Sequence, residues 1–343
     1  MPSNPTKILL LTTMVSGVLV SVSSNSWFSA WMGLEVNLMS FIPLMSNIKN
    51  MYNTEASLKY FIVQVLASAT LMFVVTMKAS TEGLFTHEET YSTSMLICTP
   101  LLLKSGAAPL HWWFPGVMEG LSWENCTLLM TVQKAAPLML LSYSIESNTF
   151  AIMIILSSVI IGAIGGLNQT SLRKIMTYSS INHTGWMLTA MTTSESMWVM
   201  YFATYSLLVT TVVATIKLSK ASFINQTMMT NKESLVMKFM MFASLLSLGG
   251  LPPFTGFMPK WFLIQSMTNN NLAPMATLMV AMSLITLYYY LKICYSSFLI
   301  LNAEPKWNMQ TQKSYPSSHI SALILTTASL AGMILCTTLT NMT

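Results

Sequence analysis

The sequence predicts an all-α, polytopic membrane protein with about eleven transmembrane helices, arranged as two inverted five-helix repeats and a C-terminal helix. Composition is the first reason: of 343 residues, 53% are hydrophobic and 8% are charged, against about 25% charged in ordinary soluble domains. The second reason is a set of uncharged runs, each of which meets or exceeds the roughly 20 residues that cross a bilayer. Examples are residues 8–34, 147–172, 261–291 and 314–343.

The charged residues and cysteines exclude several kinds of site. All eleven acidic residues are glutamates, and Arg173 is the sole arginine. Such a chain cannot form a typical phosphate clamp or two-metal carboxylate site, and its net charge of +5 indicates topology, not a nucleic-acid partner. Because Cys98, Cys126, Cys294 and Cys336 stand singly, iron–sulfur, zinc and disulfide frameworks are not expected. We therefore expect no cofactor and no metal in this chain.

Charges, glycines, prolines and polar clusters delimit the individual spans. Lys7 and the apolar run after it resemble a signal peptide, but many spans follow, so we expect a retained first helix. The ninth run is too long for one straight span, which predicts an interrupted helix. The expected spans lie near 7–23, 26–46, 57–78, 93–114, 123–144, 148–167, 174–193, 196–218, 235–267, 272–299 and 319–340.

The distribution of positive charge supports this count. With the N-terminus on side A and the spans alternating, only Lys78 falls on side B. The positive-inside rule then makes side A the compartment in which the chain is made, and it puts the C-terminus on the opposite side. The residues on side A are Lys7, Lys49, Lys59, Arg173, Lys174, Lys217, Lys220, Lys232, Lys238, Lys306 and Lys313.

We expect a single integral-membrane domain over residues 1–343. Its first inverted half covers 1–146, its second covers 147–300, and a loop with the C-terminal helix covers 301–343. The halves would run oppositely through the membrane because each holds an odd number of spans. Segments interrupted by glycine and proline, at matching places of two inverted halves, are typical of a transporter's site.

Broken helices are predicted near 104–109 and 249–259, in the fourth span of each half. Proline lacks the N–H that a helix interior needs, and its ring clashes with the preceding turn. At membrane depth such a break is tolerated only where protein covers it or where it lines a watery cavity. The break residues are Pro109 in the first half and Gly249, Gly250, Pro252, Pro253 and Pro259 in the second.

Five ionisable side chains fall near the middle of predicted spans. A charge there costs several kcal/mol unless it is paired or hydrated, so five together indicate a functional row for proton transfer. Lys292, by contrast, lies near the side A end of its span, where its long side chain can reach the interface. The five candidates are Glu35, Lys104, Lys134, His183 and Lys260.

Glu35 and Lys104 are the expected gate of this row. At a separation of about 4 Å and an effective dielectric near 20, they attract by roughly 4 kcal/mol. Moving or protonating Glu35 could then switch Lys104 between proton acceptor and donor. Alternatively, Glu35 is a structural carboxyl bonded to a neighbouring helix. His183 is either part of a hydrated relay or a satisfied hydrogen-bonding residue, and Lys134 lies close to the helix-disturbing Pro137.

The spacing Gly162-x-x-Gly165-Gly166 also has two interpretations. It is not a dinucleotide-binding fingerprint, because no strand is predicted before it. Small residues at this spacing instead let two membrane helices approach closely. We therefore expect tight helix packing here.

Five segments together resemble the antiporter-like subunits in the membrane arm of mitochondrial NADH:ubiquinone oxidoreductase, respiratory complex I. They are Glu35, 104–113, Lys134, 171–183 and 249–261, in this order over essentially the whole chain. The resemblance implies the eleven-helix animal form of the fold. It also implies a gating pair at Glu35 and Lys104, a central lysine at Lys134 and a lysine on the second broken helix at Lys260. His183 would lie on the family's polar axis.

The resemblance further implies coupling of NADH-to-ubiquinone electron transfer, carried out in other subunits, to proton translocation. NADH, FMN, iron–sulfur clusters and ubiquinone would belong to the complex and not to this chain. Partners would be other membrane-arm subunits, especially neighbouring antiporter-like ones, and membrane lipids. The location would be the mitochondrial inner membrane, with the N-terminus in the matrix and the C-terminus in the intermembrane space. Two alternatives stay open: a stand-alone cation/proton antiporter, and a structural subunit without a proton path.

Overall fold

A computed structural model describes residues 5–46, 50–81, 90–145, 148–219, 221–229, 235–295 and 317–332. In these ranges the chain forms helices, with an isolated β-bridge between Ser171 and Phe223. Some residues used in the charge and cysteine arguments, and part of the last predicted span, lie outside the described residues. They are Lys49, Lys220, Lys232, Lys306, Lys313, Cys336 and 333–340.

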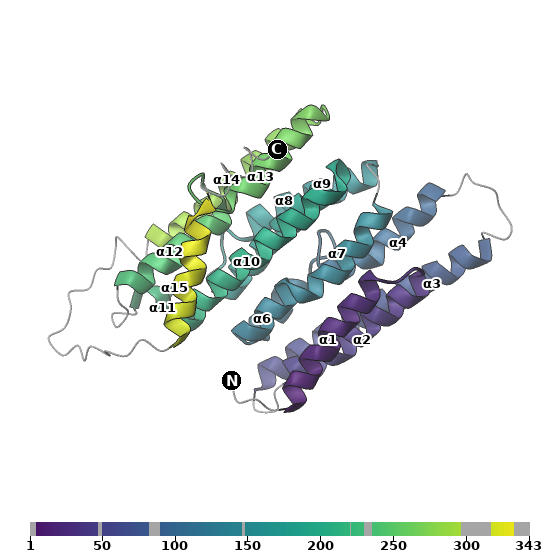
Figure 1. Cartoon of the computed structure of the whole chain (residues 1–343), viewed down its shortest axis with the longest axis horizontal. Helices are drawn as coiled ribbons and strands as arrows, with labels where there is room; N and C mark the ends of the chain where they lie inside the picture. The colour runs from purple at the N-terminus through teal and green to yellow at the C-terminus, as the bar shows by residue number, and fades with distance from the viewer. Residues whose placement is uncertain are drawn as a thin grey trace. The chain divides into compact units, whose positions relative to one another are not determined.

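The chain divides into two compact units, Met1–Ser158 and Val159–Thr343. In the first unit α1 packs along α2 (Figure 1), and α3 packs against α2, α4 and α5. Helix α7 packs on α4, so the helices that carry Lys104 and Lys134 are neighbours. The helices are α1 (Pro5–Val22), α2 (Trp27–Met45), α3 (Met51–Thr81), α4 (Thr90–Ser105), α5 (Trp113–Gly120), α6 (Trp123–Met130), α7 (Val132–Ser144) and α8 (Thr149–Gly165), which begins in this unit.

In the second unit α10 packs against α9 and α12, and α13 contacts α9, α10 and α14. Helix α15 lies against α10 and α12. The short helix α11 was not expected from the sequence. The helices are α9 (Leu172–Thr193), α10 (Glu195–Ser219), α11 (Ile224–Met229), α12 (Leu235–Gly249), α13 (Phe257–Asn269), α14 (Ala273–Tyr295) and α15 (Ser317–Leu330).

Several helices have the length and apolarity of membrane spans. In the described ranges five qualify: Pro5–Val22, Trp27–Met45, Met51–Ser80, Ser196–Ser219 and Ala273–Tyr295. Shorter apolar helices lie at Ser94–Ser105, Thr149–Gly165, Met237–Gly249 and Ser321–Leu330. Large apolar side chains point outward from these helices, as contact with lipid requires: Leu9 is 61% exposed and Met153 is 71% exposed. The chain is therefore a multi-pass membrane protein.

Both predicted helix breaks are present, but each starts later than expected. Helix α4 ends at Ser105 and α5 begins at Trp113, so the first break covers 106–112. Helix α12 ends at Gly249 and α13 begins at Phe257, so the second break covers 250–256. Each break opens on a glycine with a positive φ, 74° at Gly106 and 82° at Gly250, a conformation that glycine adopts without strain.

The prolines of the predicted breaks do not all interrupt a helix. Pro109 lies in the first break, and Pro252 and Pro253 lie in the second. Pro259, in contrast, is the third residue of α13. The N–H groups of a helix's first turn have no partner within the helix, so a proline there removes no hydrogen bond. The prediction that Pro259 belongs to the break was wrong for this reason.

A third interruption lies in the fifth predicted span, where the sequence indicated a disturbance at Pro137. Thr131, with φ −110° and ψ −78°, separates α6 from α7. Pro137, expected to be the disturbing residue, is accommodated inside α7. A proline perturbs the turn that precedes it, which for Pro137 ends at Gln133 and does not reach Thr131. Lys134 consequently lies just after an interruption instead of in mid-helix.

Glycine allows a close helix contact between α8 and α9. A Cβ atom added at Gly162 would lie 2.5 Å from the backbone N of Asn182. At Gly165 it would lie 2.3 Å from the Tyr178 ring, and at Gly166 it would lie 2.8 Å from the Tyr289 ring. The predicted close packing at this glycine motif is confirmed.

We expect Gly162→Ala to destabilise the protein by about 1–3 kcal/mol, because the new methyl group overlaps backbone that cannot move aside. The matched control is Gly116→Ala on α5, where an added Cβ meets nothing within 4 Å. That control should be neutral or stabilising by up to about 1 kcal/mol, since alanine favours helix. Thermal unfolding of the detergent-solubilised protein measures both, and equal effects would contradict the packing argument.

Candidate functional site

Lys104 is the second-last residue of α4, directly before the first break. Its side chain is 7% exposed. The next helix fixes this helix end, because Trp113 Nε1, at the start of α5, donates a hydrogen bond to the carbonyl oxygen of Leu103 at 3.1 Å. A helix C-terminus carries partial negative charge, which favours an ammonium group nearby. The break therefore gives this buried lysine a compensating dipole.

Lys134 is the third residue of α7, and 2% of its side chain is exposed. Its Nζ lies 4.7 Å from the centroid of the Phe114 ring, in a cation–π contact. The first turn of a helix carries partial positive charge, which disfavours an ammonium group. The electron-rich face of Phe114 supplies attraction where the helix dipole does not.

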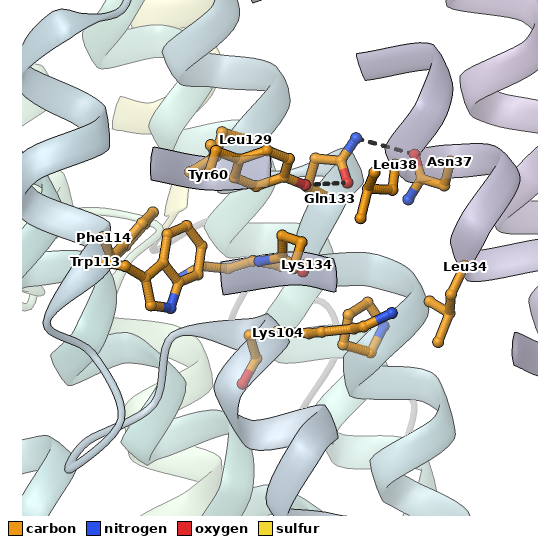
Figure 2. A pocket seen from close by; sticks show the side chains of 13 residues that line it. Leu34, Asn37, Leu38, Tyr60, Lys104, Trp113, Phe114, Leu129, Gln133 and Lys134 are labelled. Carbon is orange, nitrogen blue, oxygen red and sulfur yellow. Dashed lines mark hydrogen bonds between the residues drawn. The ribbon is translucent and has the colours of Figure 1, made fainter. Parts of the chain in front are cut away.

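A small cavity is lined by both of these lysines (Figure 2). It leaves about 20 Å³ for the centres of water molecules, and about 10–15 Å³ is enough to hold one. In Figure 2 the Lys134 side chain points toward Phe114 and Trp113, whereas the Lys104 ammonium points toward Leu34. The remaining lining residues are Asn37, Leu38, Tyr60, Gln64, Ser105, Leu129, Gln133 and Pro137.

Three neutral polar side chains beside this cavity join three helices. Gln133 Nε2, on α7, donates to Asn37 Oδ1, on α2, at 2.9 Å. Tyr60, on α3, donates its hydroxyl hydrogen to Gln133 Oε1 at 3.1 Å (Figure 2). This network was not predicted from the sequence. The sequence offered one indication of this network: Gln133 is next to Lys134, and Asn37 lies two residues after Glu35.

Glu35 lies on α2 in the same unit and is partly exposed. It is close enough to Lys104 for an electrostatic interaction. Its Oε2 atom is buried and accepts no hydrogen bond within the described part of the chain. The structure therefore brings Glu35, Lys104 and Lys134 together in one unit, with the glutamate near the lysine of the first break.

His183 lies on α9 among polar side chains, as the sequence predicted. Its Nδ1 atom is 2.9 Å from the hydroxyl of Tyr201 on α10, and its side chain is 5% exposed. The neighbouring Ser179, Ser180 and Asn182 are also buried. This helix thus holds a row of polar groups inside the protein.

Lys260 is the fourth residue of α13, just after the second break, and 5% of its side chain is exposed. Its Nζ donates to the carbonyl oxygen of Gly249, the last residue of α12, at 3.0 Å. It also lies 5.8 Å from the centroid of the Trp186 ring. Lys104 likewise lies close to a helix C-terminus, at the end of α4. Lys292, by contrast, is exposed on α14.

Comparisons with known proteins agree with one another. The family described as NADH:quinone oxidoreductase/Mrp antiporter, transmembrane, matches residues 24–286. The NADH-ubiquinone oxidoreductase chain 2 of Anopheles gambiae is 47% identical, over 95% of this chain and 96% of its own length. The protein of the same name from Locusta migratoria is 43% identical, over 90% of each chain.

A solved structure has the same fold. A chain of respiratory complex I from Thermus thermophilus, solved with bound aureothin, matches with a TM-score of 0.85 and 22% identity. The match covers 97% of this chain and 79% of that one. At this identity the likeness concerns the fold alone.

The hydrogen bond between Asn37 and Gln133 is expected to show energetic coupling. Each single change to leucine leaves a buried amide without its partner, at a cost of about 1–3 kcal/mol. The double variant Asn37→Leu/Gln133→Leu should cost less than the sum of the singles, with a coupling of about 0.5–3 kcal/mol. Thermal unfolding of the four proteins measures it, and strictly additive effects would show that the bond contributes nothing.

Proposed function

Because the chain belongs to the NADH:quinone oxidoreductase/Mrp antiporter family, we propose that it is a core membrane-arm subunit of respiratory complex I that translocates protons. One observation carries the proposal: a buried lysine stands beside each of three helix interruptions. Lys104 precedes the break before α5, Lys134 follows Thr131, and Lys260 follows the break after α12.

A buried lysine at an interruption is suited to proton transfer. The interruption frees backbone carbonyls and N–H groups, which can hold an ammonium group or water inside the membrane. Burial makes the charged form costly, so such a lysine can release its proton when a partner carboxylate moves away. Glu35 is the carboxylate in electrostatic range of Lys104. The pair has the components of a gate.

The proposed path starts at Glu35 and Lys104 and continues to Lys134. It then follows His183 and its polar neighbours to Lys260, and leaves on the opposite side or passes charge to the next subunit. Moving each proton against the membrane potential costs about 2.3 kcal/mol per 100 mV. The chain must therefore be coupled to an exergonic reaction, which in this proposal is NADH-to-ubiquinone electron transfer in other subunits.

The proposal includes the membrane topology that was expected from the sequence. Eleven spans in two inverted halves would put the N-terminus in the mitochondrial matrix and the C-terminus in the intermembrane space. Neighbouring membrane-arm subunits and inner-membrane lipids would cover the outward apolar side chains, such as Leu66, which is 59% exposed. NADH, FMN, iron–sulfur clusters and ubiquinone would be bound by other subunits.

Lys134→Met tests the proposal, because it keeps a long side chain at a buried site and removes only the titratable amine. We expect NADH-driven proton translocation by the complex in proteoliposomes to fall by about ten-fold or more, since proton-transfer groups contribute about 10²–10⁴-fold. The matched control is Lys292→Met, which removes an exposed amine and should leave translocation unchanged.

Two results would contradict the proposal. Full translocation by an assembled complex with Lys134→Met would indicate a structural subunit. Sodium-dependent proton flux through the isolated chain in vesicles, without NADH oxidation, would indicate a stand-alone antiporter. Native gel electrophoresis of the complex separates a failure of proton transfer from a failure of assembly.

A further inference from the structure

Four tyrosines form a buried cluster in the second unit. Tyr201 and Tyr205 come from α10, and Tyr289 and Tyr290 come from α14. Each is at most 2% exposed. Tyrosine is seldom completely buried, because its hydroxyl then needs a hydrogen-bond partner. The burial of four tyrosines together is therefore not explained by packing alone.

His183 lies next to one end of the tyrosine cluster. The hydroxyl of Tyr201 lies 2.9 Å from His183 Nδ1, and the ring of Tyr205 lies 5.1 Å from the imidazole, measured between centroids. Tyr201 is in electrostatic range of both Tyr205 and Tyr290. The rings of Tyr289 and Tyr290 meet edge to face with centroids 4.6 Å apart. The series therefore runs from the imidazole of His183 on α9, through two tyrosines on α10, to two tyrosines on α14.

The cluster reaches the helix end that holds Lys260. A Cβ atom added at Gly249 would lie 3.6 Å from the Tyr290 ring, and the carbonyl of Gly249 accepts the hydrogen bond from Lys260 Nζ at 3.0 Å. Lys260 also lies over Trp186, one turn along α9 from His183. His183 and Lys260 are therefore at two ends of one group of polar and aromatic side chains.

Three of the four hydroxyls are unsatisfied. Those of Tyr205, Tyr289 and Tyr290 are buried without a hydrogen-bond partner in the described part of the chain. Tyr205 approaches Ser180, and Tyr290 approaches Ser179 and Tyr289, but without the geometry of a hydrogen bond. A buried unpaired hydroxyl lowers stability, and a phenylalanine of the same shape would avoid that cost. Several adjacent hydroxyls are, however, what an ordered water needs as partners.

We propose that this tyrosine cluster binds water and carries protons between His183 and Lys260. The inference rests on the function proposed above and extends it to four further residues. In each transfer the imidazolium of His183 gives its proton to the hydroxyl oxygen of Tyr201, whose own proton passes to bound water. The water and the remaining hydroxyls repeat this exchange, and the neutral amine of Lys260 takes up the last proton. One proton enters and one leaves, and every tyrosine ends neutral.

The double variant Tyr205→Phe/Tyr290→Phe tests the relay, because it removes two hydroxyls and keeps both rings. We expect NADH-driven proton translocation by the complex in proteoliposomes to fall by about ten-fold or more, with thermal stability unchanged or raised. The matched control is Tyr288→Phe, which removes a hydroxyl from the same helix at a residue that is 59% exposed. It should translocate protons normally.

Full translocation by the double variant would overturn the relay. So would a loss of translocation that comes with lower thermal stability or poor assembly, because the hydroxyls would then be structural. Lys260→Met separates this inference from the proposed function. If Lys260→Met abolishes translocation and the double tyrosine variant does not, the lysine row stands and the tyrosine relay fails. If Lys260→Met itself translocates normally, the proposed function fails at this residue.

Discussion

An ammonium group inside a membrane protein must be compensated by dipoles of the protein, and this chain provides them by interrupting its helices. In the interior of an uninterrupted helix every carbonyl is bonded within the helix, so none is left for an ammonium group at membrane depth. Lys104 stands at the end of α4, and Lys260 binds the carbonyl that ends α12. At the second break the two depend on each other, because the Gly249 carbonyl freed by the break accepts a hydrogen bond from the buried ammonium group of Lys260. Much of the rest of the structure serves to bury these pairs.

The two units surround their lysines with different polar groups. In the first, the side-chain amides of Asn37 and Gln133 form direct hydrogen bonds that tie α2 and α7 together. In the second, hydroxyl and imidazole groups predominate, and three tyrosine hydroxyls have no hydrogen-bond partner among the described residues. Paired amides favour a rigid connection, whereas unpaired hydroxyls favour exchange of hydrogen bonds. The first arrangement suits holding a gate in place, and the second suits passing a proton along.

The positions of the buried charges could be predicted from the sequence because a charge in an apolar run is costly wherever it occurs. The breaks could be placed only approximately, since proline and glycine mark a region while the surrounding packing decides which residue ends the helix. Pro259 and Thr131 show this limit: the proline continues a helix, and the threonine interrupts one. The hydrogen bonds of the polar network could not be predicted, although two of its residues lie beside candidate site residues. Asn37, Tyr60 and Gln133 are far apart in sequence, and no local pattern indicates that they meet.

The adjacent glycines at the end of α12 differ in how much room each leaves for a side chain. Gly249 contributes its carbonyl to Lys260, and a methyl group added to it would make only ordinary contacts, the nearest at 3.6 Å. Gly250 has a φ of 82°, and a Cβ atom there would lie 3.1 Å from the Nζ atom of Lys260. A side chain at the second position would therefore strain the backbone and crowd the ammonium group. Alanine should therefore be accommodated at Gly249, whereas alanine at Gly250 should strain the backbone and displace the Lys260 ammonium group.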